Sequence, residues 1–525
     1  MSSAPMAPSP PSVIKDRRLR FLIWQSISTV SVYLFSSLLH LRLGHFSLSD
    51  SLLSFLALHA FLLLLSSSFL LLLSPCPAPA ASLPELSTTL RKSAFKWAIG
   101  GFPRPDFTVD SVSRAWRSLK SIFFLVVCVV AGIFSVVAAC WDSDEGAYSL
   151  RLRGAVFGFM YGAYYLASKR WILKFPIIQR PLFYSFKKYF YSSFTSALKM
   201  SVRWFVYSFM LLLFLPAEFQ IKGTIGRWLI SQIRVLLGIF TFSFCWEISH
   251  HLLQVLHTRR CIFAPPQGSA AAETNPSKTL LEVLEQSPPK SLLQHLAYLD
   301  LCIVSENNTE QWRRAAFFEE SGETYRQVIR ACLRPLENFT SKLVEGLEGR
   351  YGDCSDLFLK QMSLPMDFHT YSKLNAAFDD YELCAWSSRS LAALTVCSRH
   401  KDRYKVAQLS SCNTAAVSTL LTALLAVEAC LGKKTGGPSK QFLSPTSMKW
   451  ETVEEQCELH NKAYAMADVL RASIYQIVSA FWVDMQASAK SMVLDKNWIS
   501  EAKPLFGARS VLVQKLLDFL DYRAV

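Results

Sequence analysis

Glu247, His250 and His251 form the densest group of side chains in this sequence that could bind a metal ion. Glu247 and His250 stand in a Glu-x-x-His spacing, which places a carboxylate and an imidazole on one face of a helix. A di-iron site of this kind needs a second Glu-x-x-His and further acids on facing helices, and the apolar segments around it supply almost none. We therefore expect these groups to be paired or hydrated, with no metal and no cofactor.

Patterns that indicate other enzyme chemistry are missing from the sequence. Gly432-Lys-Lys-Thr435 lacks the earlier glycine of a phosphate-binding loop, since the preceding positions are Val427 and Glu428. No Gly-x-Ser-x-Gly motif occurs, and the 13 cysteines include no Cys-x-x-Cys pair. Scattered cysteines in odd number are typical of reduced thiols in the cytosol. We predict that the chain is not an enzyme.

Long apolar segments lie in the first half of the chain. A helix needs about 20 apolar residues to cross the hydrocarbon core of a bilayer. We predict six transmembrane helices, at about 21–41, 52–73, 122–141, 150–168, 204–215 and 228–252. Arg234 is the charged residue that this assignment places well inside a span, and span interiors contain almost no proline. Spans with few internal charges and prolines are more typical of a membrane anchor than of the substrate pathway of a transporter.

The gaps between these segments alternate in charge. Cations cluster before the first span, after the second and fourth, and at the end of the sixth. The other three gaps are short and poor in cations, and one of them, Asp142-Ser-Asp-Glu145, is acidic. Because Lys and Arg are retained on the cytoplasmic side, this pattern predicts six crossings with both termini in the cytoplasm.

The net charge of +15 belongs to the membrane half of the chain. Residues 1–260 contain 27 Lys and Arg against 10 Asp and Glu, whereas the remainder is slightly acidic. Cations next to a membrane are attracted to anionic headgroups. The basic composition therefore indicates contact with membrane lipid and does not predict a direct nucleic-acid partner.

Gly154, Gly158 and Gly162 repeat at intervals of four in the fourth predicted span. Two small-xxx-small steps in tandem make a flat helix face that a neighbouring helix can approach closely. We predict a helix-packing site, within the bundle in the first place, with a homo-oligomer as the other form. Chance remains the competing explanation, because glycine is common in membrane helices.

An aromatic and basic stretch, 175–196, precedes the fifth predicted span. Aromatic rings favour the headgroup level and lysines favour anionic lipid. We predict either a segment in the membrane interface or an ordinary loop with an aromatic belt, and the residues leave both open. The interface candidates are Phe183, Tyr184, Lys187, Lys188 and Tyr189.

The second half of the chain has apolar residues at helical spacing and no alternating strand pattern of useful length. We predict an all-α, polytopic membrane protein, with six transmembrane helices followed by a cytoplasmic α-helical domain. The predicted parts are a disordered N-terminus at 1–20, a membrane domain at 21–260, a linker at 261–277 and a helical domain at 278–525. Helices are expected at 278–286, 291–305, 309–348, 371–398 and 408–431, from a start at Ser444-Pro445 to about 494, and at 504–522.

One stretch after the last span resembles a known family. Leu-Ala-Tyr-Leu-Asp-Leu at 296–301 is followed by Arg313-Arg314-Ala-Ala-Phe-Phe318 and by Cys332-Leu333. With six spans and a helical second half, this resembles the transmembrane nucleoporins of the nuclear division cycle (Ndc) type. The likeness covers most of the chain as architecture and residues 288–335 as sequence. The Pro/Ser-rich N-terminus and short second half are similar to plant members.

The resemblance implies a scaffold of the nuclear pore membrane. It implies an anchor in the nuclear envelope that tethers inner-ring nucleoporins, among them the linker nucleoporin and aladin, and that supports pore assembly and nuclear transport. As docking candidates we select the helix at 504–522 and the face with Trp312, Arg313, Arg314 and Phe317, with core burial as the competing explanation. The alternative is a membrane transporter or lipid-handling enzyme of the endoplasmic reticulum with a regulatory helical domain.

Overall fold

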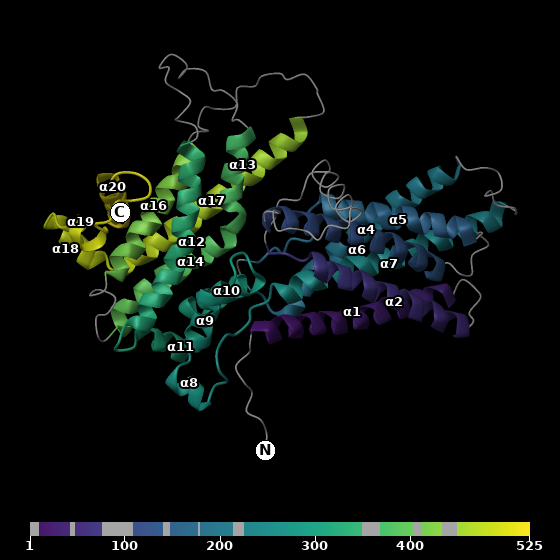
Figure 1. Ribbon diagram of the computed structural model, residues 1–525, viewed down its shortest axis with the longest axis horizontal. Coiled ribbons are helices and arrows are strands. Elements are labelled where there is room, and N and C mark those ends of the chain that lie inside the picture. The colour runs from purple at the N-terminus through teal and green to yellow at the C-terminus, as the bar shows by residue number, and fades with distance from the viewer. Residues whose placement is uncertain are drawn as a thin grey trace, which may run out of the picture. The chain divides into compact units, whose positions relative to one another are not determined.

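The computed structural model describes residues 10–41, 48–75, 109–139, 147–176, 179–213, 225–348, 368–402, 411–432 and 449–524. Within these residues every regular element is a helix, apart from an isolated bridge between Ser74 and Ile172. This confirms the all-α prediction. The chain divides into two compact units, one at Pro11–Arg259 and one that begins at Arg260 (Figure 1).

The first unit consists of six long helices in its described residues. α4 packs against α2, α5 and α7, and α6 packs against α5 and α7. These helices are α1 (Pro10–Leu41), α2 (Leu48–Leu72), α4 (Val109–Ala139), α5 (Ala147–Ala167), α6 (Leu182–Leu213) and α7 (Ile225–His257). The expectation of a disordered 1–20 is wrong from Pro10 onward, because the basic stretch before the first span is already helical.

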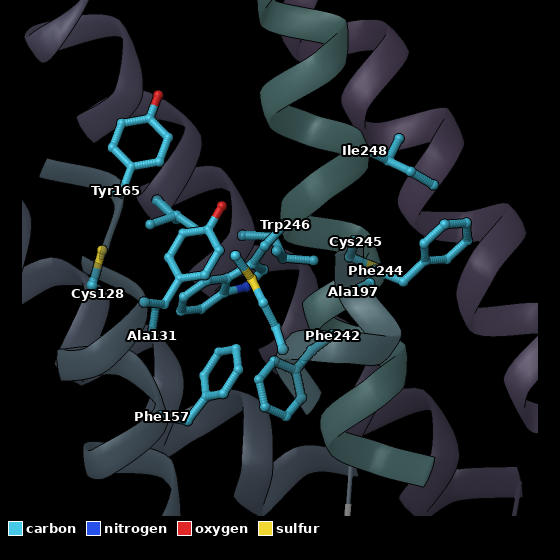
Figure 2. Packing of buried hydrophobic residues seen from close by; sticks show 14 of the residues in the cluster. Cys128, Ala131, Phe157, Tyr165, Ala197, Phe242, Phe244, Cys245, Trp246 and Ile248 are labelled. Atoms are coloured by element: carbon cyan, nitrogen blue, oxygen red, sulfur yellow. The ribbon is translucent and has the colours of Figure 1, made fainter. Parts of the chain in front are cut away.

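Aromatic rings fill the centre of this unit. The ring of Phe157 on α5 meets those of Phe242 and Trp246 on α7 edge to face, at 4.6 and 5.2 Å between centroids (Figure 2). Tyr161 adds a further edge contact with Trp246 at 4.7 Å. All four side chains are 1% exposed or less. Edge-to-face pairs of this kind add to the stabilisation from burial and fix how the two helices pack.

Four helices of the described chain are long and apolar enough to cross a membrane. Three belong to the first unit and lie within α2, α4 and α7, at Phe55–Leu72, Trp116–Ala138 and Leu229–His257. α1, α5 and α6 are not among these candidates in the described residues, and α5 carries Arg151 and Arg153 while α6 carries several cations. Six crossings therefore remain a prediction, and the acidic gap at 142–145 lies outside the described residues.

The second unit is a bundle of helices of unequal length. α12 packs against α14 and α16, and α17 packs against α14 and α16. Its helices are α8 (Ala270–Thr274), α9 (Lys278–Gln286), α10 (Leu292–Glu306), η2 (Asn308–Glu310), α11 (Gln311–Ala315), η3 (Ala316–Phe318), α12 (Glu323–Glu348), α13 (Phe368–Ala377), η5 (Phe378–Asp380), α14 (Tyr381–Lys401), α16 (Cys412–Gly432), α17 (Lys449–Ala480), α18 (Trp482–Lys490), α19 (Leu494–Trp498) and α20 (Arg509–Ala524).

Two predicted helices and the predicted linker of this unit differ from the structure. The expected helix at 309–348 is instead four elements, η2, α11, η3 and α12, and a turn at Gly322, whose φ is +65°, separates η3 from α12. The helix expected to end near 494 stops at Ala480, where the shorter α18 begins. The stretch 261–277 is not a bare linker, because it contains α8 and the fully buried Phe263. The predicted start at Ser444 lies outside the described residues.

The fourth apolar helix, Cys412–Leu431, belongs to the second unit as part of α16. Leu420, Leu424 and Val427 are fully buried, and α12, α14, α17, α19 and α20 all pack against α16. A helix that is apolar all round is either a membrane span or the centre of a large core. Because other helices pack against α16 on several sides, we interpret it as the central core helix of the second unit, which explains its apolar composition.

Candidate membrane and docking sites

The glycines of α5 lie directly against α4. A Cβ atom added to Gly154 would lie 2.6 Å from the carbonyl oxygen of Gly132, and one added to Gly158 would clash with the carbonyl oxygen of Cys128. The atoms nearest to a Cβ on Gly162 belong to side chains, with a methyl of Leu125 at 2.8 Å and the Cβ of Cys128 at 3.2 Å. The two helix backbones therefore touch at Gly154 and Gly158. This face is covered by a helix of the same chain, and Gly132 is the partner that sequence reasoning missed.

The aromatic and basic stretch forms the first turns of α6, with no break before the fifth predicted span. Phe183 and Tyr184 are 69% and 60% exposed, and Tyr191 is 75% exposed. Lys187 and Lys188 are exposed beside them, while Tyr189 stacks on His251 of α7 with ring centroids 5.3 Å apart. Of the two interpretations left open above, a loop does not apply from Leu182 onward. An exposed helical surface with rings and lysines is available to a membrane interface.

Glu247 is bound by an arginine and is not arranged as a metal ligand. The guanidinium of Arg170, just after α5, donates to both carboxylate oxygens at 2.7 and 2.8 Å. His250 Nδ1 lies 3.3 Å from the hydroxyl of Tyr165. The described residues hold no group of three His, Cys, Asp or Glu that could bind a metal. The carboxylate therefore ties the segment after α5 to α7.

A second arginine is buried in the same unit. Arg153 on α5 is 1% exposed, donates to Gln232 of α7 at 2.9 Å and lies 5.6 Å from the ring centroid of Phe205 on α6. Arg234, which the sequence analysis singled out, is half-buried. Arg153 is thus more fully buried in the protein than Arg234, and the position of Arg234 within a membrane span stays a prediction.

The start of α1 and the end of α7 meet on the same side of the first unit. Arg17 on α1 donates to the carbonyl oxygens of Leu256, His257 and Arg259 at 2.7, 3.0 and 2.6 Å. The last carbonyls of a helix have no partner within it, and a cation there also complements the helix dipole. Arg17 thus caps α7 and joins the two ends of the unit.

Three of the four docking candidates near the family-like stretch lie in the interior. Arg313, Arg314 and Phe317 are 2%, 4% and 1% exposed. Burial requires each arginine to be paired, because an unpaired charge in the interior is costly. The proposal that these three side chains form an exposed docking face is therefore wrong, and core burial is the explanation that holds.

Asp300 is the centre of the ionic cluster that buries Arg313. Its fully buried carboxylate accepts from Arg313 at 2.7 Å, from Arg260 at 2.7 Å and from the backbone N–H of Phe263 at 3.0 Å. Glu310 accepts from both arginines, at 2.7 and 2.8 Å for Arg260 and 2.8 Å for Arg313. The family-like motif thus clamps the segment after α7 onto α10 and α11.

Tyr298, in the same motif, compensates for a backbone hydrogen bond that α12 lacks. Pro335 lies inside this helix and has no N–H to donate to the carbonyl oxygen of Ala331. The hydroxyl of Tyr298, two residues before Asp300, donates to that oxygen at 2.8 Å. Tyr298 is 3% exposed, and its hydroxyl supplies this buried oxygen with the hydrogen bond that Pro335 cannot donate.

Trp312 is the docking candidate that faces outward. It is half-buried and forms a wall of a cavity of about 540 Å³, together with Gly268, Glu273, Asn275 and Glu319. The hydroxyl of Thr324 donates to Glu319 and lowers the pKa of that carboxyl. The other candidate, the last helix, turns Leu512, Leu516 and Leu520 into the core of the second unit.

The sequence of this chain matches a known protein family. A model of the family described as "Nucleoporin protein Ndc1-Nup" matches residues 7–351, which include all six helices of the first unit and the Asp300 cluster. Nucleoporin NDC1 from Pongo abelii is 25% identical over 252 residues, and its human counterpart is 24% identical over 252 residues. Each alignment covers 42% of this chain and 36% of the relative, so it spans about a third of the relative's length.

Both of these relatives are mammalian, so the likeness to plant members stays a prediction. The family match covers well over half of the chain and includes the stretch on which the resemblance was based. Membership of this family indicates a structural protein and not an enzyme. The chain belongs to the Ndc1-Nup family of nucleoporin proteins.

Proposed function

We propose that this protein is a membrane-anchoring scaffold of the nuclear pore complex. Its first unit anchors the chain in the nuclear envelope, and its second unit tethers soluble nucleoporins to the pore membrane. The observation that carries this proposal is the family match over the apolar helices and the adjoining Asp300 cluster. The Asp300 cluster lies in the second unit, shortly after the apolar helix α7 in the sequence.

The anchoring role has support in the first unit. Exposed apolar side chains cover the outer faces of α4 and α6, including Phe123, Val126, Val202 and Val206. Large exposed apolar surfaces on a helical bundle mark contact with lipid or with another protein. At the start of α6 we assign Phe183, Tyr184, Lys187, Lys188 and Tyr189 to the interface with anionic lipid.

The topology that we propose has six crossings with both termini on the cytoplasmic, pore-facing side. The cap of Arg17 on α7 supports an even number of crossings, because it joins the beginning and end of the unit. Two native sequons, at Asn307 and Asn338, test the sidedness, since both asparagines are exposed. We expect no glycosidase-sensitive mass shift. A shift at Asn307 would place the second unit in the lumen and contradict the topology.

The tethering role concerns soluble partners. From the family resemblance we propose the inner-ring linker nucleoporin and aladin, with roles in pore assembly and in protein and mRNA transport. A homo-oligomer is a further proposal, although the Gly154–Gly158 face is already covered by α4. No direct nucleic-acid partner is proposed, since the excess of positive charge lies in residues 1–260.

Localisation and proximity labelling test the function together. The tagged chain is expected in a punctate pattern at the nuclear rim, and a biotin ligase fused to its C-terminus is expected to label inner-ring nucleoporins. The control is the same ligase fused to an unrelated multi-pass protein of the endoplasmic reticulum. A reticular pattern without labelling of nucleoporins would overturn the scaffold and favour a transporter or lipid-handling protein.

A further inference from the structure

The cavity beside Trp312 is a built site on the surface of the second unit. One wall is the indole of Trp312 with Ala316, on α11 and η3, and the other is the segment from Gln267 to Pro276 that contains α8. The cavity volume is about 540 Å³, which is within the range of about 300–1,000 Å³ that ligand sites occupy. This is large enough for one long side chain with the backbone that carries it.

The ionic cluster next to the cavity holds both walls in place. Arg313 adjoins Trp312 in α11 and donates to Asp300 at 2.7 Å and to the carbonyl oxygen of Phe263 at 3.3 Å. Phe263 begins the segment that leads into the opposite wall. Ser269 then caps α8 by accepting from the N–H of Ala272 at 3.2 Å. Arg313 therefore acts as a positioning residue for the cavity, which a binding site needs if its walls are to be pre-formed.

The charges that line the cavity have one sign. Glu273 on α8 is exposed, and Glu319 lies across from it after η3. Neither lysine nor arginine occurs among the residues that line the cavity. Within the described residues the hydrogen bonds to Glu319 converge on its Oε1, from Ser321 and Thr324. These bonds orient the carboxylate and favour its charged form.

A cavity lined by an indole and two carboxylates fits an arginine side chain best. A guanidinium stacks on an indole face and binds a carboxylate through two parallel N–H groups, whereas a lysine ammonium does neither as well. Anionic partners are disfavoured, because two carboxylates repel the phosphates of lipid headgroups and of nucleic acid. Charge complementarity therefore selects a basic peptide segment over a membrane surface.

We propose that this cavity docks an arginine-bearing peptide segment of a soluble protein partner, with the guanidinium against Trp312 and between Glu273 and Glu319. The inference rests on the proposed scaffold function and gives it a recognition chemistry. It also explains why Trp312 faces outward while the neighbouring Arg313 and Arg314 are buried. One residue contacts the partner and the next two hold the site together.

The test measures peptide binding to the full chain in nanodiscs of neutral lipid. The probe is a fluorescein-labelled peptide of Arg-Gly-Ser repeats, followed by anisotropy, with matched peptides that carry Lys or Glu in place of Arg. We expect the Arg peptide to bind more tightly than the Lys peptide and the Glu peptide not to bind. Loss of the indole in Trp312→Ala is expected to weaken binding about fivefold to thirtyfold.

Matched variants separate the site from general attraction between charges. Glu273→Gln is expected to weaken binding severalfold, whereas Glu320→Gln removes the same charge from an exposed position outside the cavity lining and is expected to change it little. Trp312→Phe keeps an aromatic face and is expected to retain most of the affinity, which guards against a folding defect in Trp312→Ala. Equal effects of Glu273→Gln and Glu320→Gln would overturn the proposal, as would full binding by Trp312→Ala.

Failure of the docking site can be told apart from failure of the scaffold function. If the peptide does not bind but the chain stays at the nuclear rim and labels nucleoporins, this cavity is not the docking site and the scaffold stands. If the peptide binds as expected but the chain shows a reticular pattern, the scaffold function fails and the recognition chemistry stands. The two readouts use different samples and are independent.

Discussion

Arg170 and Glu247 form a two-pronged ion pair that joins the segment after α5 to the middle of α7. The carboxylate is fully buried and the arginine side chain is 14% exposed. Arg170 also lies 5.7 Å from the ring centroids of Tyr164 and Tyr165. Such a pair costs desolvation, but loss of one partner leaves an uncompensated buried charge, which costs more. Substituting one partner therefore tests how much this ion pair contributes to the stability of the first unit.

Removal of one partner of this pair should destabilise the first unit. We expect Arg170→Met to lower the stability by about 3–5 kcal/mol, because Glu247 keeps its charge in a low-dielectric site. The double variant Arg170→Met/Glu247→Leu should recover a large part of the loss. Thermal unfolding in detergent micelles checks both variants. A double variant less stable than Arg170→Met alone would contradict this account of the pair.

The glycines of α5 should differ in their tolerance of a methyl group. Gly158→Ala places a Cβ against the backbone of Cys128, which cannot move without separating α4 from α5. We expect a loss of about 1–3 kcal/mol, the usual cost of overpacking. Gly162→Ala is the control, since the atoms nearest to its Cβ are side-chain atoms of Leu125 and Cys128 and not backbone. Equal melting temperatures for the two variants would show that the backbones do not touch at Gly158.

Sequence reasoning was most successful where the information is local. The bounds of α9 were predicted to the residue and those of α10 to within a residue at each end, because apolar residues at helical spacing identify short amphipathic helices. The family was recognised from the stretch that contains Asp300, Arg313 and Arg314, together with the arrangement of apolar segments, and the family match confirms it. Apolar runs likewise identified α2, α4 and α7 as candidate spans.

Contacts between distant residues could not be predicted in the same way. Glu247 was recognised as an isolated acid in an apolar helix, but nothing in the local pattern identifies Arg170 as its partner. Arg313 was selected as a docking candidate because arginine is common at interfaces, and its pairing with Asp300 buries it instead. Gly132 was missed because a single glycine has no spacing pattern until the neighbouring helix is known.

The carboxylate of Asp300 should contribute far more to the free energy of unfolding than a carboxylate in a surface ion pair of the same unit. Asp300→Ala leaves the buried Arg313 with a partly compensated charge, and we expect a loss of about 3–5 kcal/mol. The control is Glu306→Ala, whose carboxylate pairs with Arg389 near the surface, and whose loss should cost about 1 kcal/mol or less. Chemical denaturation of the full chain in detergent, followed by helical circular dichroism, separates the two.

The hydroxyl of Tyr298 should contribute to stability through the carbonyl oxygen that Pro335 leaves without its usual donor. We expect Tyr298→Phe to cost about 1–3 kcal/mol, because the buried oxygen of Ala331 then lacks this hydrogen bond. Tyr475→Phe removes the same hydroxyl from a side chain that is 47% exposed, and should be neutral. If Tyr298→Phe is neutral as well, water donates a hydrogen bond to the carbonyl oxygen of Ala331 in place of the tyrosine hydroxyl.

The buried imidazole of His295 should make the folded protein less stable in mild acid. Burial lowers the pKa of His295 below its usual 6.5, outweighing the hydrogen bond between its Nδ1 and the carbonyl oxygen of Ser291 at 2.9 Å. Among the nearby charges, Asp380 raises this pKa and Lys290 lowers it. Below pH 6.5 the unfolded chain therefore binds a proton that the folded chain does not, and stability falls as the pH decreases.

A carboxylate in the same unit acts at a lower pH, which allows the two groups to be separated. Burial opposes ionisation of Glu310, but hydrogen bonds from Arg260 and Arg313 outweigh it and lower its pKa below 4.5. Its contribution to stability is therefore present above pH 4.5 and lost only below that. Between pH 7 and 5.5 the melting temperature of the wild type should fall, and His295→Gln should flatten this part of the profile while Glu310→Gln leaves it unchanged. A wild-type profile that is flat from pH 7 to 5.5 would mean that His295 is protonated as easily in the folded chain as in the unfolded one.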